Sequence, residues 1–149
     1  MNDYRFTVKN MLTTSDVARL RSKHFPDLVS LNARYAPEID LTKSMPVKPE
    51  YLDVIRTSWL LDKAAGRPAQ QIIVSGLGFG LGALLAHLLE MRWAQIIDKF
   101  GESFSMLGRS SSNSQISVPP FSYVEKKGEV QNAEVFIDLF NLLREKFTQ

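Results

Sequence analysis

The sequence contains no cysteine, and histidine is scarce, with only His24 and His87 in the chain. The lack of cysteine excludes disulfides, thiolate nucleophiles and thiolate metal sites, and it is typical of a reducing compartment. The two histidines do not stand at the spacing of a zinc site. We therefore expect no metal or cofactor. The first residues, MNDYRFTVKNML, contain no apolar core of signal-peptide length, so the expected location is the cytoplasm.

Motifs of catalysis are also missing. The nucleophile pattern G-x-S-x-G and the phosphate-binding pattern G-x-x-x-x-G-K-[ST] do not occur. The carboxylates Asp98, Glu102 and Glu125 are candidates for a shared site, but no spacing in the sequence brings two of them together. We expect these three acids to be solvated or ion-paired. The lack of catalytic motifs disfavours an enzyme without excluding one.

Charge of one sign is not concentrated anywhere. The chain contains eighteen Lys and Arg residues and sixteen Asp and Glu residues, which gives a net charge of +2. A nucleic-acid surface normally shows a basic face, so we expect no nucleic-acid partner. The densest basic cluster, Arg19, Arg21, Lys23 and His24, is typical of the solvated face of a helix.

The length of 149 residues, with 44% hydrophobic residues, predicts one domain around one core. Residues 1–48 read as an N-terminal extension. It begins with a short strand or extended arm over residues 3–11, where Tyr4, Phe6 and Val8 alternate with polar neighbours. One short helix should end at Pro26, and an irregular segment should then wrap the domain. Five side chains are its expected anchors: Leu28, Leu31, Tyr35, Ile39 and Leu41.

Residues 49–149 read as the main part of the domain. Pro49 opens a helix that Gly66 and Pro68 end, and a second, apolar helix continues to about Glu90. Three short strands follow in WAQIID, SFSMLG and QISV, and then a short helix in PPFSYVEKKG. The C-terminal helix is amphipathic, with its apolar face formed by Phe136, Leu139, Phe140, Leu143 and Phe147. These elements predict an α+β fold, with a central Gly-rich helix packed on an antiparallel sheet of about three strands.

The uncharged residues 72–89, IIVSGLGFGLGALLAHLL, contain four glycines at alternate positions and allow three interpretations. Gly78, Gly80 and Ala83 match the dinucleotide pattern G-x-G-x-x-A, with Asp98 placed to hold a ribose. The length and the spacing of the glycines are also compatible with a membrane helix. The third interpretation is a buried core helix.

The sequence around this stretch favours the core helix. A dinucleotide fold needs further parallel strand and helix units, whereas a hairpin and one long helix follow. Four glycines and His87 dilute the hydrophobicity that a membrane span requires. We therefore expect close packing of other backbone against the glycines, with the opposite side filled by Leu77, Leu81, Leu84, Leu85 and Leu88. No membrane association is expected.

Over residues 49–147 the order of features resembles a bacterial family, domain of unknown function 3806. The resemblance lies in the Gly-rich helix GLGFGLGALLAHLLEMRW, in the strand WAQIIDKFG, and in the segment VPPFSYVEKKGE before the C-terminal helix. That family is itself uncharacterised, so the resemblance implies a soluble α+β domain and transfers no catalytic residue. If its recurring positions serve binding, the matching residues are Trp93, Asp98, Phe121, Glu125 and Lys126.

Two functional hypotheses follow. The first is a non-enzymatic bacterial protein that binds another protein, for example as a toxin-neutralising (immunity) or accessory factor, with self-association left open. Exposed aromatic residues such as Trp93, Phe121 and Tyr123 would suit such an interface, although core packing suits them equally. The alternative is an enzyme or sensor that binds a nucleotide or other small molecule between the Gly-rich helix and the sheet.

Overall fold

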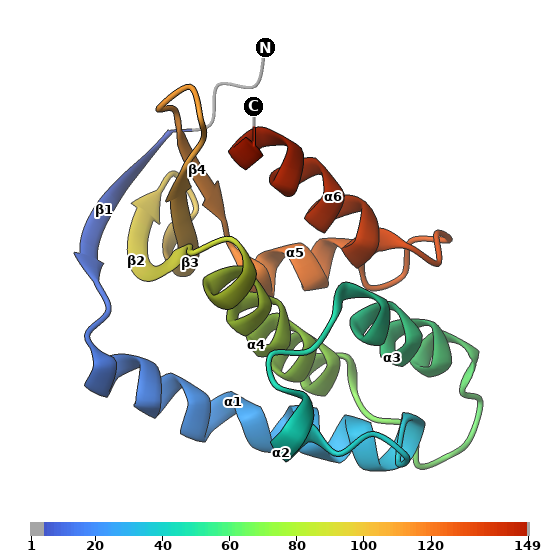
Figure 1. Cartoon of the computed structure of the whole chain (residues 1–149). Helices are drawn as coiled ribbons and strands as arrows, with labels where there is room; N and C mark the ends of the chain where they lie inside the picture. Colours follow the sequence, from blue (N-terminus) through green and yellow to red (C-terminus); the bar gives the residue numbers. More distant parts are fainter. Residues whose placement is uncertain (1–4, 149) are drawn as a thin grey trace.

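Six helices and one four-stranded antiparallel sheet make up the computed structural model, which describes residues 5–148 (Figure 1). The α+β class expected from the sequence is confirmed. The elements in chain order are β1 (Phe6–Met11), α1 (Thr14–Tyr35), α2 (Leu41–Ser44), α3 (Pro49–Leu61), α4 (Gln70–Leu88), β2 (Arg92–Asp98), β3 (Gly101–Arg109), β4 (Gln115–Val118), α5 (Pro120–Lys127) and α6 (Val135–Thr148).

The sheet has the strand order β1-β2-β3-β4 and therefore one strand more than expected. The extra strand is β1, which pairs with β2 and carries a bulge between Val8 and Asn10. Of the extended segment expected at residues 3–11, Asp3 and Tyr4 lie outside the described residues. The outer face of the sheet has a small apolar cluster of its own, centred on Ala94, Ile96 and Leu107.

The N-terminal region differs most from expectation. Helix α1 does not end at Pro26 but continues through it to Tyr35, so the segment after Pro26 is mainly helical. Proline inside a helix costs about 3 kcal/mol because it removes one hydrogen bond and crowds the preceding turn. Here Leu28 and Leu31, which follow the proline, are completely buried against the rest of the core. Tertiary packing thus outweighs the local preference to stop.

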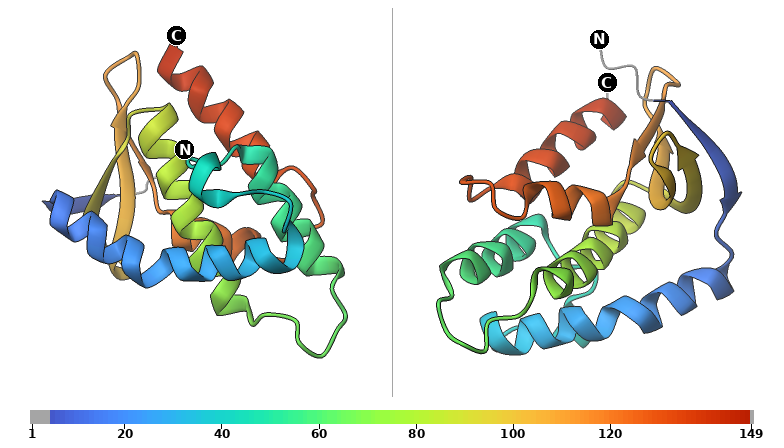
Figure 2. Two further views of the ribbon diagram at one scale, coloured as in Figure 1. Left: turned by 60° about the horizontal axis from the view of Figure 1, so that its bottom comes forward. Right: turned by 180° about the vertical axis from the view of Figure 1, so that it is seen from behind.

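Helix α4 occupies the middle of the fold, in contact with α1, α3, α5 and the sheet (Figures 1 and 2). Of its expected leucines, Leu77, Leu81, Leu84 and Leu85 are fully buried. Leu88 is 47% exposed, so the expectation that it fills the core is wrong: it lies at the last residue of the helix, beyond the packed elements. The core reaches from Leu20 to Leu143 and so includes the N-terminal region.

Among residues 5–148, α4 is also the one helix long and apolar enough to cross a membrane, by length and composition alone. About 56% of its apolar window is buried inside the protein. This burial supports the interpretation of α4 as a core helix.

Candidate functional site

The spaces beside the glycines of α4 are filled mainly by side chains from other elements. A Cβ atom on Gly78 would overlap the ring of Phe121, and one on Gly82 would overlap the ring of Trp93. On Gly76 it would lie 2.9 Å from the backbone nitrogen of Leu28 in α1. The expectation of close backbone approach is therefore met at Gly76, whereas aromatic rings provide the contact at Gly78 and Gly82.

These contacts do not match the loop geometry of the dinucleotide pattern. The glycines lie inside a regular helix that begins at Gln70, and not in a loop between a strand and a helix. The space above Gly78 is taken by Phe121, so pyrophosphate cannot approach the backbone there. Between the Gly-rich helix and the sheet, the ring of Trp93 fills the space beside Gly82.

An aromatic row continues around α4 from these two rings. The centroids of Trp93 and Phe121 are 6.0 Å apart, those of Phe79 and Trp93 are 6.4 Å apart, and Phe121 lies 4.5 Å from the ring of His24. Trp93 is only 6% exposed, and Phe121 is half-buried. The ring of Trp93 fills the space that Gly82 leaves, so little of it is exposed to a partner. The ring of Phe121 likewise fills the space beside Gly78.

The other three candidates lie together at the surface. Asp98, Glu125 and Lys126 line one wide hollow of about 1740 Å³ between the end of the β2–β3 hairpin and α5. We call it the hairpin-end hollow. Three of the residues that the resemblance implies therefore share one surface, although Asp98 comes from β2 and the other two from α5.

The most exposed large apolar side chain of this hollow belongs to Phe100, a residue that no sequence motif indicates. Phe100 lies in the two-residue turn of the hairpin and is 81% exposed, the highest value among the large apolar side chains of residues 5–148. Its backbone N–H donates to Asp98 Oδ1 at 2.8 Å, and the Lys99 ammonium lies 5.1 Å from its ring centroid. The signal was available in the sequence: an aromatic residue in a tight turn between two strands has no core to enter.

Charges of both signs surround Phe100. Arg5, Lys99 and Lys126 line the hairpin-end hollow together with Asp98, Glu102 and Glu125. The three candidate carboxylates thus line one surface, although no spacing in the sequence brings them together. Glu102 is engaged by Lys9 Nζ at 2.7 Å. Within residues 5–148, no group of three histidine or acidic side chains is arranged to hold a metal ion.

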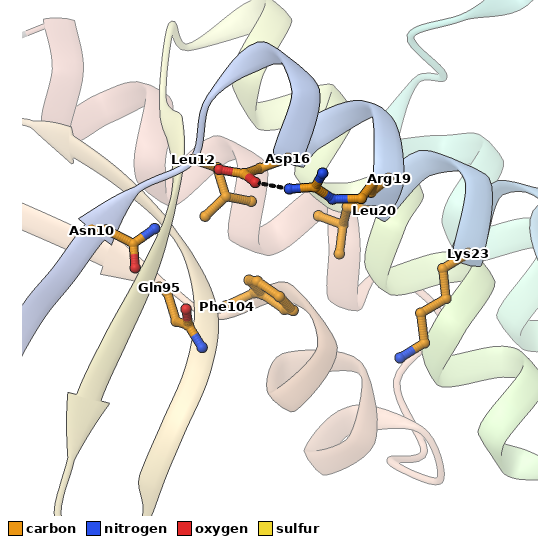
Figure 3. A pocket seen from close by; sticks show the side chains of 8 residues that line it. All are labelled: Asn10, Leu12, Asp16, Arg19, Leu20, Lys23, Gln95 and Phe104. Atoms are coloured by element: carbon orange, nitrogen blue, oxygen red, sulfur yellow. Dashed lines mark hydrogen bonds and ion pairs between the residues drawn. The ribbon is translucent and has the colours of Figure 1, made fainter.

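A second concavity lies between α1 and the sheet (Figure 3). We call it the α1–sheet pocket; its volume is about 290 Å³. The residues that line it are Asn10, Leu12, Asp16, Arg19, Leu20, Lys23, Gln95 and Phe104. None of them belongs to the Gly-rich helix.

His24 has a polar partner in α4. Its Nδ1 lies 2.7 Å from the hydroxyl oxygen of Ser75. Burial lowers the pKa of the His24 imidazole, the positive charge of Lys23 lowers it further, and Asp27 acts in the opposite direction. A neutral ring suits a residue that stacks on Phe121 between two helices. We therefore assign His24 a structural role.

Helix α3 also contains two buried charged residues, Asp53 and Arg56, which the sequence patterns did not indicate as buried. The Arg56 guanidinium donates to backbone carbonyl oxygens at the end of α5 and in the loop that follows it: those of Lys127, Gly128, Val130 and Asn132. Asp53 accepts from the backbone N–H groups of Phe136 and Ile137, at the start of α6. Burial raises the pKa of Asp53 and lowers that of Arg56. The pair positions α5 and α6, because it satisfies the backbone of the loop between them.

No protein-family model matches the chain, and searches of curated proteins and of solved structures find no significant match. The resemblance to domain of unknown function 3806 accordingly stays a prediction.

Proposed function

We propose that this chain is a non-enzymatic protein-binding domain that contacts its partner through the hairpin-end hollow. The observation that carries the proposal is Phe100, an aromatic side chain displayed at a hairpin turn, beside a hollow lined by charges of both signs. Aromatic side chains dominate the binding energy at the centres of interfaces, and a polar rim commonly surrounds them. Ile97, 40% exposed on the preceding strand, extends the apolar area.

Recognition through the side chains of this hollow is favoured over pairing of a partner strand with an edge of the sheet. Strand β1 is an edge strand, but a bulge interrupts it, and the exposed Lys9 lies at that bulge. The other edge strand, β4, has four residues and is followed by Pro119 and Pro120. Bulges, lysines, prolines and short lengths are the usual protection of an edge against pairing with another chain. Recognition by added strands is therefore disfavoured.

The more specific proposal is a bacterial protein of the cytoplasm that neutralises a toxin or assists another factor. Its support is the resemblance of residues 49–147 and the lack of a catalytic motif. Asp98, Glu125 and Lys126 would then form the charged rim around Phe100, where charges choose the partner and accelerate association more than they strengthen binding.

The test is capture of a partner in extracts of the cells that make the protein, with the full chain as bait. Phe100→Ser should abolish capture of a protein that the natural chain retains. Leu61→Ser is the matched control, because Leu61 is 73% exposed on α3, far in sequence from the hollow. Loss with both variants, or with neither, would contradict the assignment of the site. Metal- or cofactor-dependent turnover by the purified chain would contradict the non-enzymatic assignment.

A further inference from the structure

The α1–sheet pocket has the composition of a small-molecule site. Leu20, which is 5% exposed, and the half-buried Leu12 and Phe104 provide apolar walls. The polar groups come from two directions, with Arg19 and Lys23 on α1 and Asn10 and Gln95 on the sheet (Figure 3). Small-molecule sites are typically apolar concavities with a few polar groups that fix the orientation of the ligand.

The charge of this pocket is unbalanced toward the positive. Asp16 is already engaged: it accepts from the backbone N–H of Thr13 and forms an ion pair with Arg19. Within residues 5–148, Lys23 has no carboxylate within ion-pair distance. One positive charge is thus left without a partner at the rim of the pocket, above an apolar floor.

The two amide side chains keep hydrogen-bonding capacity for a ligand. The Gln95 amide nitrogen donates to Glu102 Oε2 at 3.1 Å, which directs the amide group and leaves its oxygen without a donor among the described residues. The Asn10 side chain makes only a 3.4 Å contact with the carbonyl oxygen of Met11. Amides can orient the polar end of a ligand that also carries a charge.

We propose that the α1–sheet pocket binds a small organic monocarboxylate with an apolar body. Lys23 would provide the cationic partner of the carboxylate, with help from the N–H groups of Arg19 that Asp16 does not use. Phe104, Leu12 and Leu20 would cover the apolar body. The pocket volume of about 290 Å³ corresponds to roughly ten water molecules. A volume of this size suits a compact acid.

The probe is 3-phenylpropionate, titrated at millimolar concentration into the isotope-labelled full chain and followed by NMR. We expect saturable shifts of the resonances of Asn10, Leu20 and Phe104. The neutral 3-phenylpropionamide keeps the body but lacks the charge, and acetate keeps the charge but lacks the body. Both should bind at least about tenfold more weakly, as expected for the loss of one charge-assisted contact or of one buried ring.

Two variants decide whether the pocket is responsible. Lys23→Gln should weaken 3-phenylpropionate binding by about tenfold, since it removes the cation of this pocket that no described carboxylate pairs with. Lys43→Gln removes the same charge from the exposed side of α2, outside the pocket, and should leave binding unchanged. Both lysines are exposed, so neither change threatens folding. Absence of shifts in the natural chain, equal binding of the amide, or equal effects of the two variants would overturn the proposal.

Discussion

Trp93 and Phe100 are aromatic residues of one hairpin, yet their surroundings are opposite. Trp93 is 6% exposed and fills the space above Gly82, whereas Phe100 is 81% exposed in the turn of the hairpin. The difference arises from α4: its glycines leave hollows that only large side chains from neighbouring elements fill. An aromatic residue placed over such a glycine is committed to the core, and the one in the turn stays available for a partner.

The largest expected effect on stability concerns the buried member of this pair, Trp93. Trp93→Ala should lower the free energy of unfolding by about 3–5 kcal/mol, because it removes a buried ring and opens a cavity beside Gly82. Phe100→Ala should change it by less than about 0.5 kcal/mol, as is usual for an exposed side chain. Urea denaturation of both variants measures the contrast. Similar losses of stability would show that Phe100 also belongs to the packed structure.

A second change removes the buried cation that holds the loop between α5 and α6. Arg56→Met should lower the free energy of unfolding by about 3 kcal/mol, because several buried carbonyl oxygens lose their donor. Arg144→Met, an exposed arginine of α6, is the matched control. Hydrogen exchange should accelerate at residues 128–137 in the first variant and not in the second. Unchanged exchange there would contradict the role of Arg56.

Substitutions at two glycines sharpen the comparison within α4. Gly76→Ala should destabilise the protein by about 1–3 kcal/mol, since the new methyl group meets the backbone of α1 at Leu28. Gly80→Ala should be nearly neutral, because its neighbour is the flexible end of Leu52 at 3.0 Å and alanine favours the helix by about 0.8–1 kcal/mol. The larger Gly80→Leu should disrupt folding. Thermal unfolding of the three variants gives the ranking, and equal alanine effects would contradict it.

Local sequence signals account for much of the fold. The proline at the start of α3, the turn residues between the strands and the apolar face of α6 depend on near neighbours, so the pattern predicts them directly. Pro26 shows the limit of such signals. Its local preference is to end a helix, but Leu28 and Leu31 bury against α4, and that contact depends on residues far along the chain.

The candidate site divides in the same way. Of the residues that the resemblance implies, Asp98, Glu125 and Lys126 share a surface, whereas Trp93 lies in the core. No local pattern states which side chain will cover a glycine of another element. Arg56 could have been found, because it falls within the apolar stripe of Leu52, Ile55 and Trp59 on α3, where a charge requires a buried partner.

The smallest expected effect concerns the charged rim of the hairpin-end hollow. Lys126 is exposed, and no ion pair engages it within residues 5–148, so Lys126→Gln should change the free energy of unfolding by less than about 0.5 kcal/mol. In the proposed complex the same change should alter the association rate and its dependence on salt, while Phe100→Ser acts mainly on dissociation. Stopped-flow measurements with the captured partner separate the two. If Lys126→Gln left association unchanged at low salt, the charges around Phe100 would have no part in recognition, and the aromatic side chain alone would define the surface.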